Sequence, residues 1–218
     1  MKVLLYTLAG VAVLGVVATV GVRRFLAPPQ TPPAYTGPRP EPAEDGYISH
    51  TESIRIDAPI DEFREWVNHS ELEDLGLESD NTPSVVRTEV IRGTWDPDQG
   101  RVGDRRRVVL DDGHFTVEEV LVDEPDVFRY IVWGYTNYAR LMIDHAIGEF
   151  NFEEEGGKTH LTWTYSFHPR SAIVRPFLSN FVSGTWADLM RNTLEAMRDG
   201  GERQALSTFT QFLRGQNR

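Results

Sequence analysis

The sequence predicts an α+β domain in which an antiparallel sheet packs against a long C-terminal helix, preceded by one N-terminal transmembrane helix. Three observations predict this class. Strand-like alternation recurs at short intervals between turn motifs, apolar residues follow a helical period near the C-terminus, and residues 3–22 form an apolar run without a charge. The chain has 218 residues, which is enough for one substantial domain.

The first expected element is the apolar run at residues 3–22. As a helix rising about 1.5 Å per residue it would be roughly 30 Å long, which matches the hydrocarbon core of a bilayer. A cleaved signal peptide is the alternative, although its apolar region is usually shorter, and Ala27 followed directly by Pro28 is a poor cleavage site. We therefore expect a single-pass membrane anchor. Basic residues flank the run on both sides, so the charges do not decide which side of the membrane the domain faces.

The next segment, residues 27–46, contains seven of the 13 prolines of the chain. Such a stretch favours the extended polyproline II conformation and behaves as a semi-rigid linker. At about 3.1 Å per residue it would hold the following domain up to roughly 60 Å from the bilayer.

The folded domain is predicted to begin at residue 47 with a strand at residues 48–56. A helix with Asp61 as its N-cap and a short helical piece near residues 71–77 follow. Turn motifs rich in Asp, Pro and Gly separate the later segments, and strands joined by tight turns indicate an antiparallel meander. Six further strands are expected at residues 84–92, 104–110, 115–122, 128–135, 141–153 and 159–167.

The end of the domain is predicted to be helical, because apolar residues recur at three- and four-residue steps from Ile173 to Met197. Pro176 marks either the first turn of this helix or a kink. Gly200-Gly201 is expected to end it, and a short amphipathic tail is expected at residues 202–214.

This order of elements resembles the helix-grip fold of the START-type and pollen-allergen-like superfamily (SRPBCC). "IRIDAP" at residues 54–59, "GEFNF" at 148–152 and "GGKTHLTW" at 156–163 are similar to the first, sixth and seventh strands of that family. Trp186, Leu189 and Met190 resemble its long helix. The match covers residues 47–198 and most resembles the polyketide cyclase/dehydrase and lipid-transport branch. The resemblance implies a curved sheet gripping the helix, with an apolar cavity that binds lipids, sterols, hormones or polyketides, in some members with catalysis.

Side-chain parity on the last two strands indicates what would line such a cavity. In the predicted strand at 159–167 the aromatic side chains share one face, and that face must point at the helix. In the preceding strand small residues share a face with Phe150. Small residues beside aromatic ones leave room either for a pocket or for close helix packing. The expected ligand-binding residues are Trp163, Tyr165, Phe167, Phe150, Ala146, Gly148, Phe181, Trp186 and Met190.

Three polar residues have the parity of the apolar face, namely His50, Glu52 and Asp144. Because a buried unpaired polar group costs about 1–3 kcal/mol, we expect them to be paired, wetted by a cavity or moved to its rim. They are also the candidates for orienting a ligand or for acid–base catalysis. Asp144 and His145 are neighbours on a strand and are expected to point to opposite faces, which argues against a catalytic dyad.

Several classes of function are disfavoured by composition. The net charge of −11 disfavours nucleic acid as a partner, and the absence of cysteine excludes thiolate metal sites and cysteine nucleophiles. The six histidines show no metal-ligand spacing, so we expect no metal and no cofactor. The basic cluster at residues 105–107 is interpreted as a solvated strand face, with contact to an anionic lipid head group as the alternative.

These observations favour a membrane-anchored binding or transport protein for a hydrophobic, lipid-like small molecule. One alternative is a polyketide cyclase/dehydratase-like enzyme that uses the acid–base residues named above. The other alternative is a non-catalytic interaction module, which predicts a filled interior without a cavity of ligand size, roughly 300 Å³ or more.

Overall fold

The computed structural model of the chain describes residues 27–77 and 82–216. The predicted membrane anchor at residues 3–22 lies outside these ranges. None of the helices inside them is both long and apolar enough to cross a membrane.

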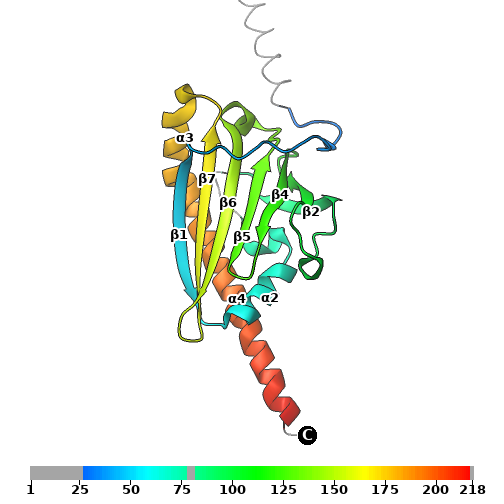
Figure 1. The fold of residues 1–218 in the computed structure, drawn as a ribbon, viewed down its shortest axis with the longest axis vertical. Coiled ribbons are helices and arrows are strands. Elements are labelled where there is room, and N and C mark those ends of the chain that lie inside the picture. Colours follow the sequence, from blue (N-terminus) through cyan, green and yellow to red (C-terminus); the bar gives the residue numbers. More distant parts are fainter. Residues whose placement is uncertain (1–26, 78–81, 217–218) are drawn as a thin grey trace, which may run out of the picture.

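Within the described residues, seven antiparallel strands form one sheet in the order β1-β7-β6-β5-β4-β3-β2. Sequential strands from β2 to β7 are neighbours, which confirms the predicted meander, and β1 adds to the free edge of β7 (Figure 1). The strands are β1 (Ile48–Ile56), β2 (Val85–Arg92), β3 (Arg105–Leu110), β4 (Phe115–Asp123), β5 (Val127–Trp133), β6 (Ile143–Glu154) and β7 (Thr159–Pro169).

The helices are α2 (Ile60–His69), α3 (Arg175–Phe181) and α4 (Ala187–Gln216), with a short 3-10 turn at Leu72–Leu75. A π-helical turn at Val182–Trp186 joins α3 to α4. Pro176 lies in the first turn of α3, so it starts the helix and does not kink it. The prediction that Asp61 caps α2 was wrong, because Pro59 occupies the N-cap position. Asp61 is the second residue of the helix, where its negative charge still interacts favourably with the helix dipole.

The predicted helix stop at Gly200-Gly201 was wrong, because α4 continues through both glycines. A Cβ atom on Gly200 would lie 2.2 Å from the ring of Trp66, and one on Gly201 would lie 2.5 Å from the ring of Phe63. The two glycines therefore let α2 lie directly on α4, and this contact outweighs their poor helix propensity. Residues 202–214 belong to α4 and do not form a separate tail; the end of α4 projects beyond the sheet (Figure 1).

The hydrophobic core lies between α4 and one face of the sheet, which we call the inner face. Residues 161, 163, 165 and 167 of β7 point into it, as their parity predicted, and meet Met190 and Leu194 of α4. The curved antiparallel sheet with its long C-terminal helix matches the helix-grip arrangement.

The opposite, outer face of the sheet is crossed by residues 27–47, which we call the strap (Figure 1). Tyr35 of the strap donates a hydrogen bond from its hydroxyl to the carbonyl of Gly134 at 2.7 Å. Arg105 of β3 donates to the carbonyls of Tyr35 and Gly37, the latter at 2.8 Å. The strap forms no helix or strand, and it is docked on the sheet, whereas the sequence predicted a spacer that extends away from the domain.

The basic cluster at residues 105–107 is not the solvated face that its sequence suggested. Arg105 and Arg107 lie under the strap, and the side chain of Arg105 is only 3 % exposed. Each arginine is neutralised by a carboxylate of a neighbouring strand: Arg105 by Glu119, Arg106 by Glu118 and Arg107 by Glu89. The prediction was wrong because it assumed that a strand side chain pointing away from the core is exposed to water.

Candidate functional site

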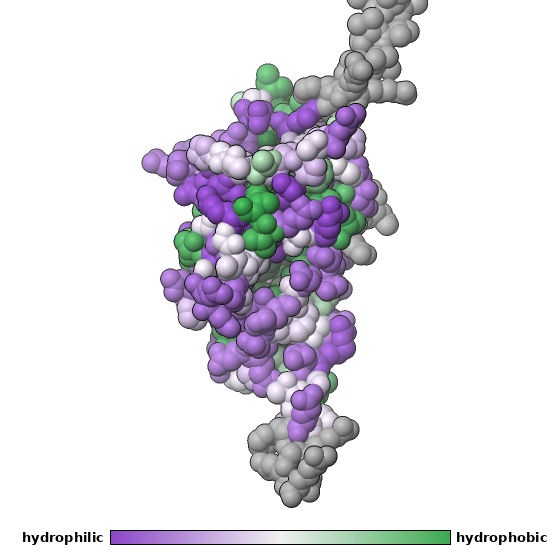
Figure 2. All heavy atoms as spheres, turned by 90° about the vertical axis from the view of Figure 1, so that its right-hand side faces the viewer, coloured by the Kyte–Doolittle hydropathy of each residue, from purple (hydrophilic) through white to green (hydrophobic). Residues whose placement is uncertain are grey.

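A cavity of about 440 Å³ lies between the inner face of the sheet and the segment formed by α2 and its following turn. Val90 and Thr94 line it and are themselves exposed, so the cavity reaches the surface beside β2. Figure 2 looks onto this side of the molecule, where apolar side chains interrupt a hydrophilic surface. The apolar wall is formed mainly by Val67, Phe128, Phe150, Phe152, Trp163 and Met197.

Arg101 contributes a buried charge to the cavity wall. Its guanidinium donates to both carboxylate oxygens of Asp123, at 2.7 and 2.9 Å, and to the amide oxygen of Asn68 at 3.1 Å. Burial alone would raise the pKa of Asp123, but the hydrogen bonds and charge of Arg101 outweigh it and hold the pKa below its ordinary value. This ion pair stays charged at neutral pH.

Arg64 of α2 is less well satisfied than Arg101 and Arg106 on the same wall. Its Nη2 lies 4.0 Å from Asp123, and its guanidinium stacks over the ring of Phe152 at 4.5 Å. Its Nη1 is buried and has no hydrogen-bond partner among the described residues. Burial lowers the pKa of Arg64, with Asp123 opposing this effect. Leaving a buried N–H donor without a partner costs about 1–3 kcal/mol, so Arg64 has hydrogen-bonding capacity that no described residue uses.

Arg106 and Trp95 meet at the mouth of the cavity. Arg106 donates to Glu118 at 2.8 Å, and its guanidinium lies 4.1 Å from the centre of the Trp95 ring. Trp95 has a positive φ of 56°, unusual for a bulky residue. The carboxylate of Asp104 holds this turn by accepting from the backbone N–H groups of Thr94 at 3.0 Å and Trp95 at 2.6 Å. The loop between β2 and β3 is therefore built to place an aromatic ring against the cavity.

The space beside Gly148 of β6 is filled by a neighbouring aromatic side chain. A Cβ atom on Gly148 would lie 2.3 Å from the ring of Tyr130 on the neighbouring strand. Burial, with the nearby charge of Glu118, raises the pKa of Tyr130 far above its ordinary value, so the phenol stays neutral. Gly148 thus serves ring packing, which was the alternative to a pocket at this position.

Two of the nine predicted ligand-binding residues, Phe150 and Trp163, line the cavity. The others lie in the core or beside it, towards the N-terminal end of α4. There the ring centres of Tyr165, Phe167 and Trp186 are 4.6 to 5.1 Å apart. The difference arises because the cavity opens towards β2 and α2, whereas the prediction placed it between β6, β7 and the C-terminal helix. The residues at this end are Ala146, Gly148, Tyr165, Phe167, Phe181, Trp186 and Met190.

His50 and Glu52 are paired with each other, which was one of the expected outcomes. His50 Nε2 lies 2.8 Å from Glu52 Oε1, and Arg191 of α4 donates to the same oxygen at 2.9 Å. Burial would raise the pKa of Glu52, but these hydrogen bonds lower it below the ordinary value. Both residues lie on edge strand β1, at the opposite edge of the sheet from β2, and neither is among the described residues that line the cavity.

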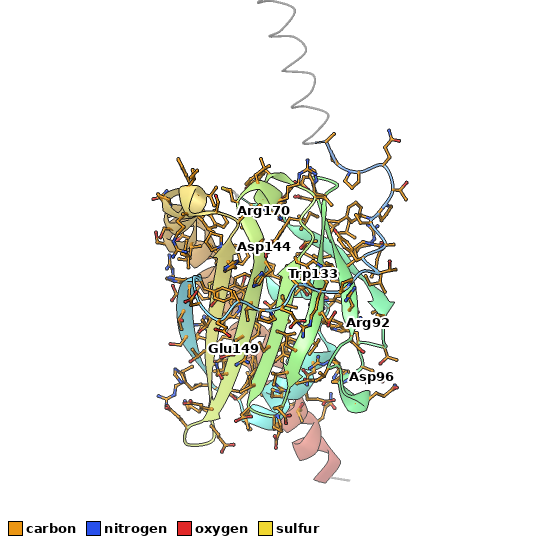
Figure 3. All side chains as sticks on the ribbon, turned by 45° about the horizontal axis from the view of Figure 1, so that its top comes forward. Arg92, Asp96, Trp133, Asp144, Glu149 and Arg170 are labelled. Carbon is orange, nitrogen blue, oxygen red and sulfur yellow. The ribbon has the colours of Figure 1, made fainter. Side chains whose placement is uncertain are left out.

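Asp144 lies outside the cavity as well, and its predicted orientation was wrong. A register shift between Ile143 and His145 breaks the alternation of β6. Asp144 Oδ2 consequently lies 3.0 Å from His145 Nδ1, so the two neighbours interact although a regular strand would separate them. Figure 3 shows Asp144 and Arg170 near one another at this end of the sheet. None of the three acid–base candidates therefore faces the cavity.

The sequence patterns did not predict the polar cavity residues Arg64, Arg101 and Arg106. A signal existed for Arg106, which shares its parity with Val108 and Leu110 on β3 and so points inward. For Arg64 the signal was weaker: it lies one helical turn before Val67, which also lines the cavity. Arg101 lies in a loop, where no periodicity indicates direction.

Comparison with known proteins agrees with the observed fold. The family model described as polyketide cyclase / dehydrase and lipid transport matches residues 47–202. The crystal structure of Ara h 8.0201 is similar at 14 % identity and a TM-score of 0.51, covering 74 % of this chain and 99 % of its own. The di-domain ARO/CYC BexL from the BE-7585A biosynthetic pathway has 19 % identity and a TM-score of 0.52, covering 72 % of this chain and 50 % of its own. At these identities the likeness shows the fold alone. No curated protein matches the sequence.

Proposed function

The chain belongs to the polyketide cyclase/dehydrase and lipid-transport family, and on that premise we propose that it binds a hydrophobic, lipid-like small molecule in the cavity beneath α2. The observation that carries the proposal is the cavity itself, about 440 Å³ in volume, with aromatic side chains on its wall and an opening beside β2. Cavities of roughly 300–1,000 Å³ with apolar walls and few polar groups are typical of small-molecule sites.

The two alternatives have less support. An interaction module with a filled interior does not fit, because the cavity exceeds the size that this alternative allowed. A cyclase-like enzyme that uses His50, Glu52 and Asp144 does not fit either, because these residues do not line the cavity. The binding role requires an apolar surface and fixed polar groups. The cavity lining supplies both, because nearly half of its residues are polar or charged and the others are apolar or aromatic.

The ligand that suits this wall is amphipathic and carries an acceptor group, such as a carboxylate. Arg101 and Arg106 already have carboxylate partners, whereas Arg64 shares Asp123 only at 4.0 Å and keeps an unpartnered buried Nη1. A carboxylate placed at Arg64 would gain a charge-assisted hydrogen bond. Its hydrocarbon part would lie against Phe150 and Trp163.

We further propose that residues 3–22 anchor the protein in a membrane, with the cavity held near the bilayer. The support is the length of the apolar run, which equals a membrane span of roughly 30 Å. Membrane fractions washed with alkaline carbonate should retain the full chain and lose a variant that lacks residues 1–26. Loss of the full chain in the wash would contradict the anchor.

The ligand proposal is tested by partly filling the cavity mouth. Val90 lines the cavity and is 50 % exposed, so Val90→Trp narrows the opening at little cost to folding. Val86 on the same strand is 46 % exposed and is not a lining residue, which makes Val86→Trp the matched control. Titration with a fluorescent fatty acid should give at least 10-fold weaker binding for Val90→Trp and unchanged binding for Val86→Trp. Equal affinities in the two variants, or no binding by the wild type, would sink the proposal.

The role of Arg64 is tested with two probes of similar size. Arg64→Gln should weaken binding of the fatty acid by about 10-fold or more, because a charge-assisted hydrogen bond contributes roughly 1.5–3 kcal/mol. Binding of an uncharged fatty alcohol of the same chain length should change little. An equal loss for both probes would show that Arg64 shapes the cavity and does not recognise the head group.

A further inference from the structure

A cluster of three side chains of types that can ligate metals lies on the outer face of the sheet, away from the cavity. His145 of β6 and His168 of β7 are cross-strand partners in the sheet register. Their rings stack with centres 5.0 Å apart and planes at 20°. The register shift in β6 brings the carboxylate of Asp144 to 3.0 Å from His145 Nδ1. One donor atom from each of the three residues lies within 4.8 Å of the other two.

Hydrogen bonding within the domain leaves part of this cluster unsatisfied. His168 Nδ1 is buried and has no hydrogen-bond partner among the residues that the structure describes. Burying a polar atom without a partner is costly, and such an atom in a native protein requires an explanation. The groups beside His168 are the imidazole of His145 and the carboxylate of Asp144, and both are ligand types for divalent transition metals.

Tyr47 at the end of the strap orients His145 from the other side. Its hydroxyl lies 2.8 Å from His145 Nε2 and accepts a hydrogen bond from the backbone N–H of Ala43 at 2.9 Å. When His145 donates from Nε2 to this oxygen, its Nδ1 carries the lone pair and faces Asp144. A ligating histidine commonly donates its second N–H to an oxygen in this way, which fixes its tautomer.

We propose that Asp144, His145 and His168 bind one divalent transition metal ion, with Zn²⁺ as the best-fitting probe. Two imidazole nitrogens and one carboxylate oxygen suit Zn²⁺, Co²⁺ or Ni²⁺, whereas Mg²⁺ and Ca²⁺ prefer oxygen ligands throughout. Bonds of about 2.1 Å in a tetrahedral site place the ligand atoms about 3.4 Å apart. The observed separations require small side-chain rotations, which the half-exposed Asp144 allows.

Arg170 is the competing charge at this site. Its Nη2 lies 3.8 Å from Asp144 Oδ1, and its side chain is 55 % exposed. An exposed ion pair at this distance contributes little, so the guanidinium can leave when the metal binds. The bound ion would fasten β6 to β7 at the point where Tyr47 joins the strap to His145.

The test is metal titration of the untagged full chain in mild detergent, after removal of metal with a chelator. Calorimetry should show one Zn²⁺ per chain for the wild type. His168→Gln and Asp144→Asn should each weaken binding at least 10-fold, since even loss of an outer-shell partner costs 10- to 100-fold. The matched control is His160→Gln, because His160 with Glu153 and Glu155 forms an exposed cluster on the hairpin between β6 and β7.

Two further measurements distinguish binding at this site from binding elsewhere on the chain. Co²⁺ should give visible absorption bands that disappear in His168→Gln. Zn²⁺ should raise the unfolding midpoint of the wild type and not that of Asp144→Asn, whose metal-free midpoint shows whether it is folded. Absence of Zn²⁺ binding, binding retained in both site variants, or binding lost in His160→Gln would each overturn the proposal.

Discussion

The contact between α2 and α4 makes a prediction that runs against ordinary helix propensity. Replacing glycine by alanine inside a helix normally stabilises it by about 1 kcal/mol. At Gly201 the new methyl group would lie 2.5 Å from Cδ2 of Phe63, which is 0 % exposed and has no room to move away. Forcing an extra methyl group into a packed core costs about 1–3 kcal/mol. We therefore expect Gly201→Ala to be neutral at best and to lose up to about 2 kcal/mol.

Gly184 provides the matched control on the same continuous helical segment. Gly184 lies in the π-helical turn between α3 and α4, and a Cβ atom there would meet no atom within 4 Å, so Gly184→Ala should stabilise the segment by up to about 1 kcal/mol. The difference between the two variants cancels the propensity effect and leaves the steric cost of about 1–3 kcal/mol. Urea unfolding followed by tryptophan fluorescence measures both free energies of unfolding with the same slope.

A double-mutant cycle assigns the steric cost to its partner. In a Phe63→Leu background the smaller side chain should relieve part of the penalty of Gly201→Ala, giving a coupling free energy of about 0.5–3 kcal/mol. If Gly201→Ala stabilises the protein as much as Gly184→Ala does, the two helices are not in contact here, and steric packing against Phe63 does not account for the continuous α4.

Three further predictions concern the buried ion pairs and the strap. Arg101→Met should cost about 3–5 kcal/mol in urea unfolding, because it leaves the buried carboxylate of Asp123 with no charged partner closer than Arg64 at 4.0 Å. Arg55→Met, which breaks an exposed pair with Glu155, should cost less than about 1 kcal/mol; equal costs would contradict the burial of the first pair. Because the pKa of Asp123 is lowered in the folded state, its contribution is complete above the ordinary pKa of about 3.9 and is lost as the pH falls further. Asp123→Asn should therefore lose less stability than the wild type between pH 5 and 2, and parallel pH profiles would argue against this assignment. Tyr35→Phe removes one hydrogen bond of about 1 kcal/mol that holds the strap, so proteolysis within residues 27–46 should accelerate about 5-fold without a change in the unfolding of the domain; an unchanged cleavage rate would show that this bond does not hold the strap.

The strands were predictable because their signals are local. The first strand has the predicted bounds, residues 48–56, and β2 to β7 each begin within two residues of the predicted start. Alternation has a period of two residues, and the turns between strands contain Asp, Gly and Pro, so neither signal depends on distant parts of the chain. Long-range packing overrode the local signal at Gly200-Gly201, because the residues that require glycine there lie in α2, more than 130 positions earlier in the chain.

The candidate site was harder to predict, because the position of a cavity depends on where the surrounding helices and loops leave space unfilled. Parity correctly placed Phe150 and Trp163 on the inner face, but every inward residue of β6 and β7 satisfies the same rule. Only the position of α2 and its following turn decides that the cavity opens towards β2, while the aromatic rings near Trp186 fill the other end. No periodicity in the sequence carries that information.

The outer face shows why parity and exposure must be treated as separate properties. Arg105 and His145 point away from the core as alternation requires, yet each is only 2 % exposed because the strap lies over them. Once buried, Arg105 requires the carboxylate of Glu119, and the two ring nitrogens of His145 lie within hydrogen-bond distance of Tyr47 and Asp144. A segment without regular structure thus converts a polar strand face into a second buried layer. His145 belongs to that layer, and together with His168 and the half-exposed Asp144 it forms the donor cluster for which we propose a metal ion.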